Sequence, residues 1–487
     1  MFYGSLARLF QVTNFREPLA MPRLLLINPS NVNKGLGNLR ATAWPPLNLP
    51  YIAAVTPSNY DVAILDENVS PFRFQEADIV GITAYTSSVN RGYRIARQYR
   101  QHGIPVVMGG IHVSMRPDEA LMYCDTVVVG EAEEVWPQLL VDFEKGRLRR
   151  RYDGRPVDLT RLPLPRRDLL PRRHYRWGSL QTSRGCPMDC AFCSVTAFNG
   201  RRFRRRPLDS VLEELDQIPQ RLVMLADDNL IGYGEADRQW AAQFFQALIA
   251  RRCKKYFFAQ ASLQVGADRE LLRLAAAAGI RIFFVGLESI NLESLSAYNK
   301  HVNLQHLKRY DYQQLVANIR RSGIACLGAF VLGGDHEDRR VFFDTLRFIR
   351  SAQIDILQMT KPTPLPGTRL WRQMDQAGRI MSWNFPADWD SYRLTKLVFR
   401  PARMSIEEVY QGFTYLRERY YSLGETLGRT WRTLCATRSP SATLLAWLIN
   451  RSYAKAFRES DHYRRYRRLN LASMFEPKDQ DGGRASA

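Results

Sequence analysis

The sequence has few cysteines, no long hydrophobic run and a shortage of acidic side chains. Seven cysteines in 487 residues exclude a small fold held together by disulfides and indicate a reducing compartment. The longest mainly apolar stretch, residues 442–449, is shorter than the roughly 18 residues that a membrane span requires. Residues 1–20 lack the continuous apolar segment and the cleavage site of a signal peptide. We therefore expect a cytoplasmic protein whose fold begins near Met21.

Acidic residues number 48 against 69 Lys and Arg, which gives a formal net charge of +21. So basic a chain attracts anions, such as nucleic acids, anionic lipid headgroups, or phosphorylated or carboxylated substrates. The hydrophobic share of 45% is ordinary for a globular protein and excludes wholesale disorder. The length suffices for about two to four domains, each with a sizeable core.

Residues 21–150 alternate between short apolar runs and helical patterns. Because strands separated by helices favour a parallel sheet with helices on both faces, this part predicts a doubly wound, Rossmann-like α/β domain. Ligands of such sheets bind beyond the carboxyl ends of the strands, where this sequence has small and polar residues. The strands are expected at residues 23–28, 61–66, 78–84, 105–108 and 126–129.

Residues 151–177 are rich in Arg and Pro and predict an extended linker. A second alternation over residues 178–385 has six strand–helix units, which predict a (β/α)6 partial TIM-type barrel with its active site at the strand C-termini. Residues 386–487 predict a helical C-terminal region rich in Arg, Tyr and Trp. The barrel strands are expected at residues 179–182, 222–226, 256–261, 282–287, 325–332 and 354–359.

Three of the cysteines, Cys186, Cys190 and Cys193, fall within eight residues after the first expected barrel strand. Three thiols at this spacing can turn inward from one loop around one metal centre. A structural zinc site requires four ligands, and the next cysteine, Cys253, is sixty residues further on. Three cysteines instead suit a [4Fe–4S] cluster with one iron left open for a substrate or cofactor. The alternative is a set of three buried structural thiols.

The spacing Cys186-x-x-x-Cys190-x-x-Cys193, with Phe192 before the last cysteine, resembles the signature of the radical S-adenosylmethionine (SAM) superfamily. The resemblance continues at the ends of the later barrel strands. The matching segments there are Asp227-Asp228-Asn229, Gly286–Ser289, Val331–Gly334 and Pro364–Thr368. The resemblance implies that polar side chains in the first two segments contact the amino acid and ribose of SAM, although each could instead cap the helix that follows it. These side chains are Asp228, Asn229 and Glu288.

The N-terminal domain resembles the cobalamin-binding domain that precedes the barrel in one large branch of this superfamily. The resemblance rests on Asn28-Pro29, on Gly109-Gly-Ile-His112 with Ser114, and on Gly130-Glu-Ala-Glu133. It implies that small residues let the backbone approach a flat corrin ring, and that hydroxyl groups bond the nucleotide tail. The implied cofactor-binding residues are Asn28, Thr83, Ser87, Gly109, Gly110, His112, Ser114, Gly130 and Glu131.

The Asp-x-His-x-x-Gly motif that supplies a histidine to cobalt in other cobalamin proteins is absent from the sequence. Neither His102 nor His112 has an aspartate two residues before it. We therefore expect cobalamin to bind without a histidine ligand. The alternative for this domain is a flavodoxin-like fold that holds no cofactor.

Within this branch, residues 193–200 and 227–232 look most like the group that contains the hopanoid C-2 methylases. The resemblance implies a methyltransferase that cleaves SAM to a 5′-deoxyadenosyl radical, abstracts hydrogen from an unactivated carbon and adds a methyl group from cobalamin. The implied partners are a hydrophobic or lipid-like small molecule and a flavodoxin or ferredoxin that donates electrons.

Other functions stay open. An oxidative cyclisation or rearrangement without methyl transfer would resemble the anaerobic cyclase of chlorophyll synthesis, and the mass of the product would separate the two reactions. A methylthiotransferase acting on tRNA would need further cluster cysteines in the N-terminal domain, where only Cys124 is present. A metal-stabilised RNA-binding protein would show no cleavage of SAM.

Two basic segments, Arg201–Arg206 and Tyr463–Arg468, bear on the choice of partner. Basic residues interleaved with aromatic ones can bind RNA, rest on a membrane or form a solvated face. No separate RNA-binding module follows the barrel, so a contact with the inner face of a membrane is favoured over nucleic acid. In that arrangement Trp431, Trp447 and Leu448 would face lipid.

Overall fold

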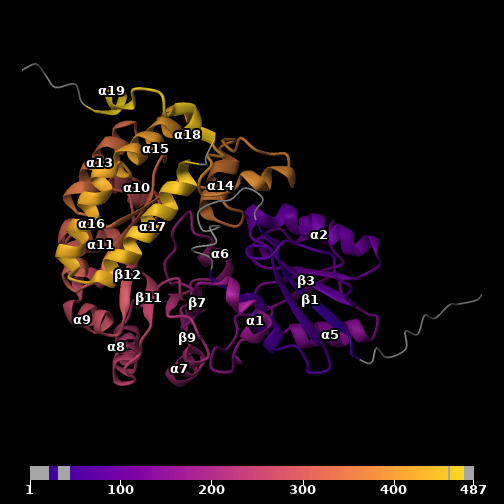
Figure 1. Cartoon of the computed structure of the whole chain (residues 1–487). Coiled ribbons are helices and arrows are strands. Elements are labelled where there is room, and N and C mark those ends of the chain that lie inside the picture. The colour runs from indigo at the N-terminus through magenta and orange to yellow at the C-terminus, as the bar shows by residue number, and fades with distance from the viewer. Residues whose placement is uncertain (1–20, 31–43, 459–460, 477–487) are drawn as a thin grey trace, which may run out of the picture.

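The computed structural model describes residues 21–30, 44–458 and 461–476 (Figure 1). Residues 1–20, for which no signal peptide is expected, lie outside the described residues. Two parallel sheets lie side by side, the N-terminal one in indigo and purple and the second one in magenta to orange (Figure 1). Helices of the C-terminal region, in yellow, lie against the second sheet. The expected α/β architecture of two sheet domains followed by helices is confirmed.

The N-terminal sheet has six parallel strands in the order β2-β1-β3-β4-β5-β6. Chain order reverses between β1 and β3, and this switch point is where doubly wound sheets bind ligands. Each strand expected from the sequence is present within two residues of its bounds. The strands are β1 Arg23–Asn28, β2 Asp61–Asp66, β3 Ile79–Thr83, β4 Val106–Gly109, β5 Thr126–Val129 and β6 Arg151–Asp153.

Helices cover both faces of this sheet, which explains why its strands are apolar throughout. On β1, Leu25 and Ile27 pack toward α2 (Val89–Gln101), while Leu24 and Leu26 pack toward the opposite layer. That layer contains α1 (Asn48–Ala54) and α5 (Trp136–Glu144). Two short helices, α3 (Ile111–Met115) and α4 (Pro117–Ala120), follow β4 at the carboxyl edge.

The sixth strand differs from the prediction. The sequence indicates a linker from residue 151, but β6 extends the sheet over Arg151–Asp153 by pairing with β5. Only Tyr152 of this strand is buried. One buried residue in a three-residue strand leaves no alternation to detect.

The second sheet has six parallel strands in the order β7-β10-β11-β12-β13-β14, with β7 and β14 at its edges. Strands that pair in chain order through helical crossovers form the predicted partial barrel. The strands are β7 Trp177–Leu180, β10 Leu222–Leu225, β11 Tyr256–Ala261, β12 Ile280–Glu288, β13 Ala325–Val331 and β14 Ile356–Thr360.

The crossover helices pack on one face of the barrel strands. Val223 of β10 and Phe283 of β12 belong to this layer, together with apolar residues of the helices. The helices are α7 Leu208–Asp216, α8 Glu235–Ala250, α9 Arg269–Ala277, α12 Tyr312–Arg321 and α13 Arg340–Ser351. Shorter elements at the strand ends are the hairpin β8 (Ser183–Arg184) and β9 (Arg204–Arg205), with α6 Ser194–Asn199, α10 Leu292–Ala297, α11 His301–Leu307 and α14 Arg369–Gln376.

The opposite, inner face of the barrel is covered by α17 (Pro440–Arg458). Leu445 and Ile449 of this helix pack against inward residues such as Met224 and Ile282. Figure 1 shows α17 crossing in front of the strands. The predicted C-terminal helices are thus present, and the others are α15 Ile406–Tyr420, α16 Leu423–Thr437, α18 Asp461–Tyr466 and α19 Leu471–Phe475. Among the described residues no helix combines the length and the apolar character needed to cross a membrane.

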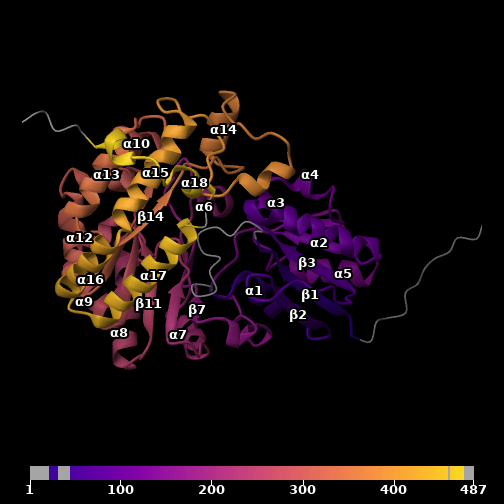
Figure 2. The ribbon, with the colours of Figure 1, turned by 45° about the horizontal axis from the view of Figure 1, so that its top comes forward.

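A segment after the barrel returns to the N-terminal domain. Its short 3-10 helix Ala387–Ser391 packs against α2, and Figure 2 shows this orange segment reaching over to the purple helices. Trp389 is fully buried there and donates hydrogen bonds from Nε1 to both carboxylate oxygens of Glu119, at 2.8 and 3.1 Å. Asn90 on α2 donates to the carbonyl oxygen of Ala387 and to Asp390. The segment that follows the barrel therefore holds the barrel domain against the N-terminal domain.

Candidate cofactor cavity at the domain interface

A cavity of about 630 Å³ lies between the two sheets. Its walls combine the carboxyl ends of β1, β3, β4 and β5 with residues from the carboxyl edge of the barrel and from α6. Cavities of roughly 300–1,000 Å³ are typical of small-molecule and cofactor sites. The predicted crevice of the first domain and the predicted mouth of the barrel therefore open into one space.

Most residues predicted for the first domain line this cavity. They are Asn28, Thr83, Gly109, Gly110, Gly130 and Glu131. Asn28 donates to Asp66 on the neighbouring strand, and Thr83 accepts a hydrogen bond from Asn48. These contacts fix the polar side chains at the switch point between β1 and β3.

The glycines keep the wall close to the strand ends. Gly110 has a φ of +95°, and a Cβ built on it would lie 2.8 Å from Oγ1 of Thr83. Gly130 has a φ of +82°, and a Cβ there would lie 2.5 Å from the carbonyl oxygen of Gly154. Only glycine combines this backbone conformation with so little space. Ser114 bridges the two loops, because its hydroxyl donates to Gly110 and accepts from the N–H of Gly130.

His112 and Ser87 are placed differently from the residues above and do not line the cavity. His112 is 1% exposed, lies 3.1 Å from Thr86 and 3.5 Å from Glu119, and stands edge-on to Trp389. Burial lowers its pKa, while Glu119 opposes that shift. The structure therefore places His112 in the contact between the domains, and Ser87 in the half-buried turn before α2.

The three cysteines lie in one loop between β8 and α6. Hydrogen bonds from two distant elements hold this loop: Ala191 N–H donates to the carbonyl of Tyr298, and Leu370 N–H donates to the carbonyl of Ala191. Burial raises the pKa of Cys190 to about 12, and the charges of Cys193 and Cys186 add to that rise. Burial also raises the pKa of Cys193, again with a contribution from Cys186. The three thiols are thus close enough to influence one another.

The other four cysteines lie elsewhere. Cys124 is buried and its thiol contacts the carbonyl oxygens of Ala120 and Thr126. Cys326 is buried within β13, Cys253 follows α8, and Cys435 is exposed on α16. These four thiols therefore lie outside the loop that carries Cys186, Cys190 and Cys193.

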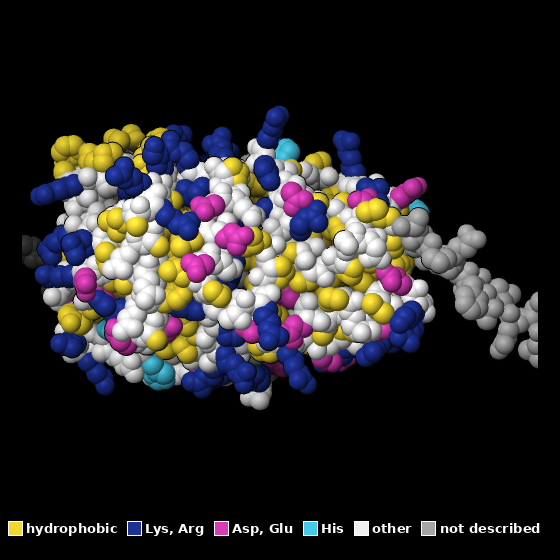
Figure 3. Space-filling view, turned by 90° about the horizontal axis from the view of Figure 1, so that it is seen from below, with side chains coloured by type: hydrophobic (Ala, Val, Ile, Leu, Met, Phe, Trp, Pro, Cys, Tyr) yellow, Lys and Arg dark blue, Asp and Glu magenta, His cyan; other side chains and the backbone are white. Residues whose placement is uncertain are grey.

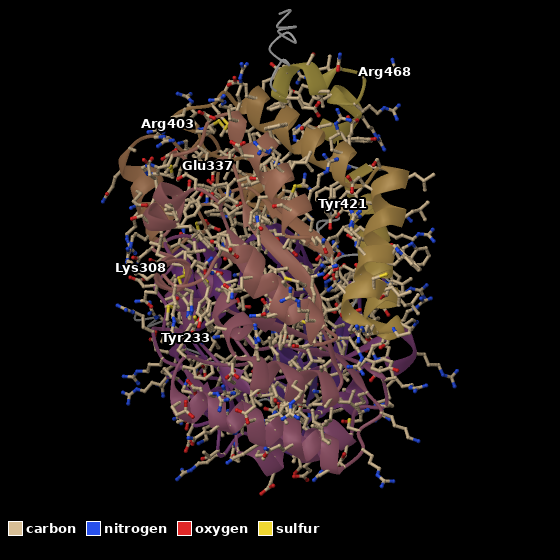
Figure 4. All side chains as sticks on the ribbon, turned by 90° about the vertical axis from the view of Figure 1, so that its left-hand side faces the viewer. Tyr233, Lys308, Glu337, Arg403, Tyr421 and Arg468 are labelled. Carbon is tan, nitrogen blue, oxygen red and sulfur yellow. The ribbon has the colours of Figure 1, made fainter. Side chains whose placement is uncertain are left out.

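Side chains that the sequence did not single out surround the thiols. The hydroxyl of Tyr233 lies 3.6 Å from the sulfur of Cys186. Lys300 is half-buried, forms an ion pair of 2.7 Å with Glu288, and lowers the pKa of Cys190 through its charge. Figure 4 shows Tyr233 low on the barrel side of the molecule and Glu337 above it. Neither Tyr233 nor Lys300 belongs to a motif, so only the fold shows that they flank the loop that carries Cys186, Cys190 and Cys193, called the cluster loop below.

The residues after β10 have three separate environments. Asp227 is fully buried and accepts hydrogen bonds from the backbone and hydroxyls of Thr182 and Ser183. Asp228 lines the cavity, accepts one bond from the N–H of Gly185, and has its pKa raised by burial to about 6. Asn229 is buried and bonds the backbone of Gly232 and Ser262. Of the predicted SAM contacts Asp228, Asn229 and Glu288, Asp228 alone lines the cavity.

Two arginines join the cluster loop to the first domain. Arg184, two residues before Cys186, pairs with Glu131 at 3.2 Å and with Glu133 at 2.7 Å. Arg204, its neighbour across the β8–β9 hairpin, also pairs with Glu131. Burial raises the pKa of Glu131, but the two arginines hold it below its usual range. The carboxylate of Glu131 therefore acts mainly as a bridge between the domains.

The basic run after the cluster loop also has structural contacts. Arg206 is 1% exposed and pairs with the buried Glu214, to which Tyr51 of the first domain also donates a hydrogen bond. Arg205 lies 4.6 Å from the ring of Trp240. Only Arg201 and Arg202 of this run are exposed. Arg204 and Arg206 of the run thus serve the domain interface, whereas Arg205 packs within the barrel domain.

The residues present fit the implied cofactors. Among the described residues no three His, Cys, Asp or Glu side chains converge as ligands of a single ion. The thiolates of a four-iron cluster each bind a different iron atom, so three separated cysteines match that donor set. A bound iron cluster would also reverse the raised thiol pKa values, because its positive charge favours thiolate. The strand-end glycines leave the open wall that a flat ring requires.

Comparisons with known proteins agree with this geometry. The family model described as "B12 binding domain" matches residues 34–140, and the one described as "Radical SAM superfamily" matches residues 180–349. Together the matches cover more than half of the chain. The chain is a cobalamin-binding radical SAM enzyme. Its cofactors are accordingly a [4Fe–4S] cluster, SAM and cobalamin.

Among curated proteins the chain is similar to bacteriochlorophyllide d C-12(1)-methyltransferase of Chlorobaculum tepidum, with 28% identity over 83% of this chain and 88% of that protein. It is also 28% identical to the hopanoid C-2 methylase of Rhodopseudomonas palustris, over 70% of this chain and 66% of that protein. Among solved structures, the radical SAM methyltransferase TsrM from Kitasatospora setae matches with a TM-score of 0.65 and 17% identity, over 90% of this chain and 98% of that one. This structural likeness shows a shared fold.

Proposed function

We propose that this radical SAM enzyme transfers a methyl group to an unactivated carbon of a hydrophobic, lipid-like small molecule. The single observation that carries the proposal is the shared cavity, because strand ends of the cobalamin-binding domain and of the barrel open into one space. A substrate there can face both cofactor sites without leaving the protein. The methyltransferase relatives support the same reaction class.

The residues have separate roles in this proposal. Cys186, Cys190 and Cys193 hold the cluster, and Asp228 with Glu288 orients the amino acid and ribose of SAM. The crevice residues Asn28, Thr83, Gly109, Gly110 and Gly130 hold the corrin ring at the β1–β3 switch point. When bound, these cofactors supply a 5′-deoxyadenosyl radical and a transferable methyl group.

The chain's own contribution is positioning and exclusion of water. The Arg184 and Arg204 pairs with Glu131 and Glu133 fix the cluster loop relative to the cobalamin domain. Lys300 places a positive charge near Cys190, which favours its thiolate form. Reactive radicals need such a closed, rigid setting to avoid side reactions.

Three features support the proposed hydrophobic substrate, electron donor and membrane contact. Apolar residues of the cavity wall favour a hydrophobic substrate, and they include Trp44, Leu47, Ile111, Val195 and Phe198. The exposed Arg201 and Arg202, close after the cluster loop, suit an acidic electron donor such as flavodoxin or ferredoxin. Exposed apolar residues on α16 and α17 support a peripheral membrane contact.

The test is anaerobic purification followed by assay of iron, sulfide and corrinoid, and then incubation with SAM, a reductant and lipid extracts from a strain that lacks the gene. We expect all three cofactors to bind, 5′-deoxyadenosine to form, and one lipid-like component to gain a CH₂ in mass. A product formed without that gain would favour cyclisation or rearrangement. Absence of iron or of SAM cleavage would refute the proposal.

A further inference from the structure

A second cavity, of about 490 Å³, lies between α15, α17 and α18, apart from the cofactor cavity. Its lining contains one carboxylate, Glu418, and four arginines. The arginines are Arg417, Arg458, Arg464 and Arg467. Among the described residues none of these four guanidinium groups forms an ion pair. The cavity is therefore strongly positive and has room for an anionic group.

Arg417 is the buried member of this set. It is 6% exposed, and within the part of the chain that the structure describes its Nη2 atom has no hydrogen-bond partner. Rings of Phe457 and Tyr463 lie 4.5 and 4.4 Å from its guanidinium carbon. Burial lowers the pKa of Arg417 to about 10, and burial together with the charge of Arg417 lowers the pKa of Lys361 to about 7. Two cations buried within reach of each other gain free energy when an anion binds between or beside them.

An apolar strip begins at the edge of this cavity. Tyr421 and Ser422 line the cavity, and α16 starts at the next residue. Leu423, Leu427 and Trp431, spaced by four residues on one face of α16, are 77, 60 and 67% exposed. Leu444 and Leu448 on the adjacent α17 are also exposed and complete the strip. In the view from below, hydrophobic side chains project at the upper left beside Lys and Arg side chains, on the side where α16 and α17 lie (Figure 3).

We propose that the arginine cavity binds the phosphate of an anionic phospholipid headgroup, while the strip on α16 and α17 rests among the acyl chains. Guanidinium groups match phosphate oxygens in pairs, which suits a cavity lined by four of them. A free phosphate would leave the strip in water, whereas a lipid occupies both features at once. Helices that combine basic and apolar faces rest at membrane surfaces in this way. The inference rests on the peripheral contact of the proposed function and defines its site.

The test is sedimentation of the full-length protein with vesicles, without substrate or reductant, so that a failure of methyl transfer does not affect the result. One set of vesicles contains phosphatidylglycerol in phosphatidylcholine, and the other contains phosphatidylcholine alone. The test variant carries Arg458→Gln, Arg464→Gln and Arg467→Gln, which are exposed and leave the buried Arg417 intact. The matched control carries Arg73→Gln, Arg94→Gln and Arg97→Gln, three exposed arginines of the N-terminal domain.

We expect the wild type to bind the anionic vesicles, and the test variant to lose at least about tenfold in affinity, because three arginines near the membrane surface no longer attract the anionic headgroups. The control should stay within about twofold of the wild type. A second variant, Leu427→Gln with Trp431→Gln, should also weaken binding and should leave the fluorescence-detected unfolding midpoint unchanged.

Other outcomes would overturn the proposal. Equal losses in the test variant and in the control would show a diffuse effect of net charge. Equal binding to both kinds of vesicle would exclude headgroup recognition. Saturable binding of glycerol 3-phosphate without binding to vesicles would assign the cavity to a soluble phosphate ester.

Discussion

Asp227 and Asp228 are neighbours in the chain with opposite surroundings. Asp227 is enclosed by the backbone and hydroxyls of Thr182 and Ser183, whereas Asp228 lines the cavity with one donor, the N–H of Gly185. The sequence places both after β10, at the edge where ligands bind. The resemblance to the radical SAM superfamily pointed to Asp228, but the pattern of residues gives no reason to prefer it, because the strand ends at Leu225 and no alternation continues to define the faces of the two side chains.

At other positions of the site, too, the sequence alone predicts only part of the arrangement. The spacing of Cys186, Cys190 and Cys193 is carried by one short loop, so sequence alone could predict that the thiols gather. Tyr233 and Lys300 come from separate strand ends and could be found only in the folded chain. His112 follows two glycines of the crevice in the sequence, but it lies at the start of α3 and points into the domain contact.

Replacement of Cys190 by alanine should abolish cleavage of SAM and reduce the iron content of the anaerobically purified protein. The two remaining thiols cannot complete the set of three ligands that holds the cluster. Iron and sulfide assays with measurement of 5′-deoxyadenosine check this. Cys253→Ala, outside the loop, is the control and should keep both properties. An active Cys190→Ala enzyme would rule out this ligand set.

The pKa of Asp228, raised by burial to about 6, makes the stability of the cofactor-free protein depend on pH. The group is protonated in the folded protein below this value, and its ionisation is harder in the folded than in the unfolded state. The wild type should therefore lose stability relative to Asp228→Asn as pH rises from about 4 to 6, by at most about 3 kcal/mol. Urea denaturation of both proteins at several pH values measures this difference. A difference that does not change with pH would show an unshifted carboxylate.

At the scale of elements, the hairpin β8–β9 has only four residues in its strands, yet it joins the cluster loop to the cobalamin domain. Two-residue strands show no periodicity, so the sequence could not reveal them. The strands β1, β12 and β13 were predictable because each contains a long apolar run. The helix α17 was expected to be helical, but its role in covering the inner face of the barrel depends on contacts distant in sequence.

Glu131→Gln tests the hairpin contact. The change leaves Arg204 against a neutral side chain, whereas Arg184 keeps its ion pair with Glu133. Loss of a buried ion-pair partner costs up to about 3–5 kcal/mol. We expect a lower urea midpoint and a faster loss of cluster absorbance during unfolding. Glu134→Gln, an exposed neighbour in the same segment, is the control and should change stability by less than about 0.5 kcal/mol. Equal effects of the two changes would contradict the bridging role.

At the scale of the whole molecule, two of the contacts that join the sheet domains come from separate parts of the chain. One is the group of ion pairs at Glu131 and Glu133, and the other is Trp389 seated between Glu119 and His112. In the chain, Glu131 and Glu133 precede the barrel, and Trp389 follows it. Relative motion of the domains would require both to open.

Trp389→Phe should loosen the second contact, since it removes the indole N–H and leaves the carboxylate of Glu119 with fewer donors. Hydrogen bonds to charged groups contribute about 1.5–3 kcal/mol, and a loss of this size is expected for the domain contact. Hydrogen exchange should increase in residues 385–392 and in α3 and α4. Trp383→Phe, at a half-exposed indole, is the control. Unchanged exchange in both regions would show that Trp389 does not hold the domains together.

The position of α17 has a consequence for how the protein is made. Ribosomes add about 5–20 residues per second, so all six barrel strands leave the ribosome seconds before residues 440–458 do. During that interval inward residues such as Met224, Ile282 and Leu327 have no covering helix. The nascent barrel therefore exposes an apolar surface of the kind that chaperones bind, and its folding can finish only after residues 440–458 have been synthesised.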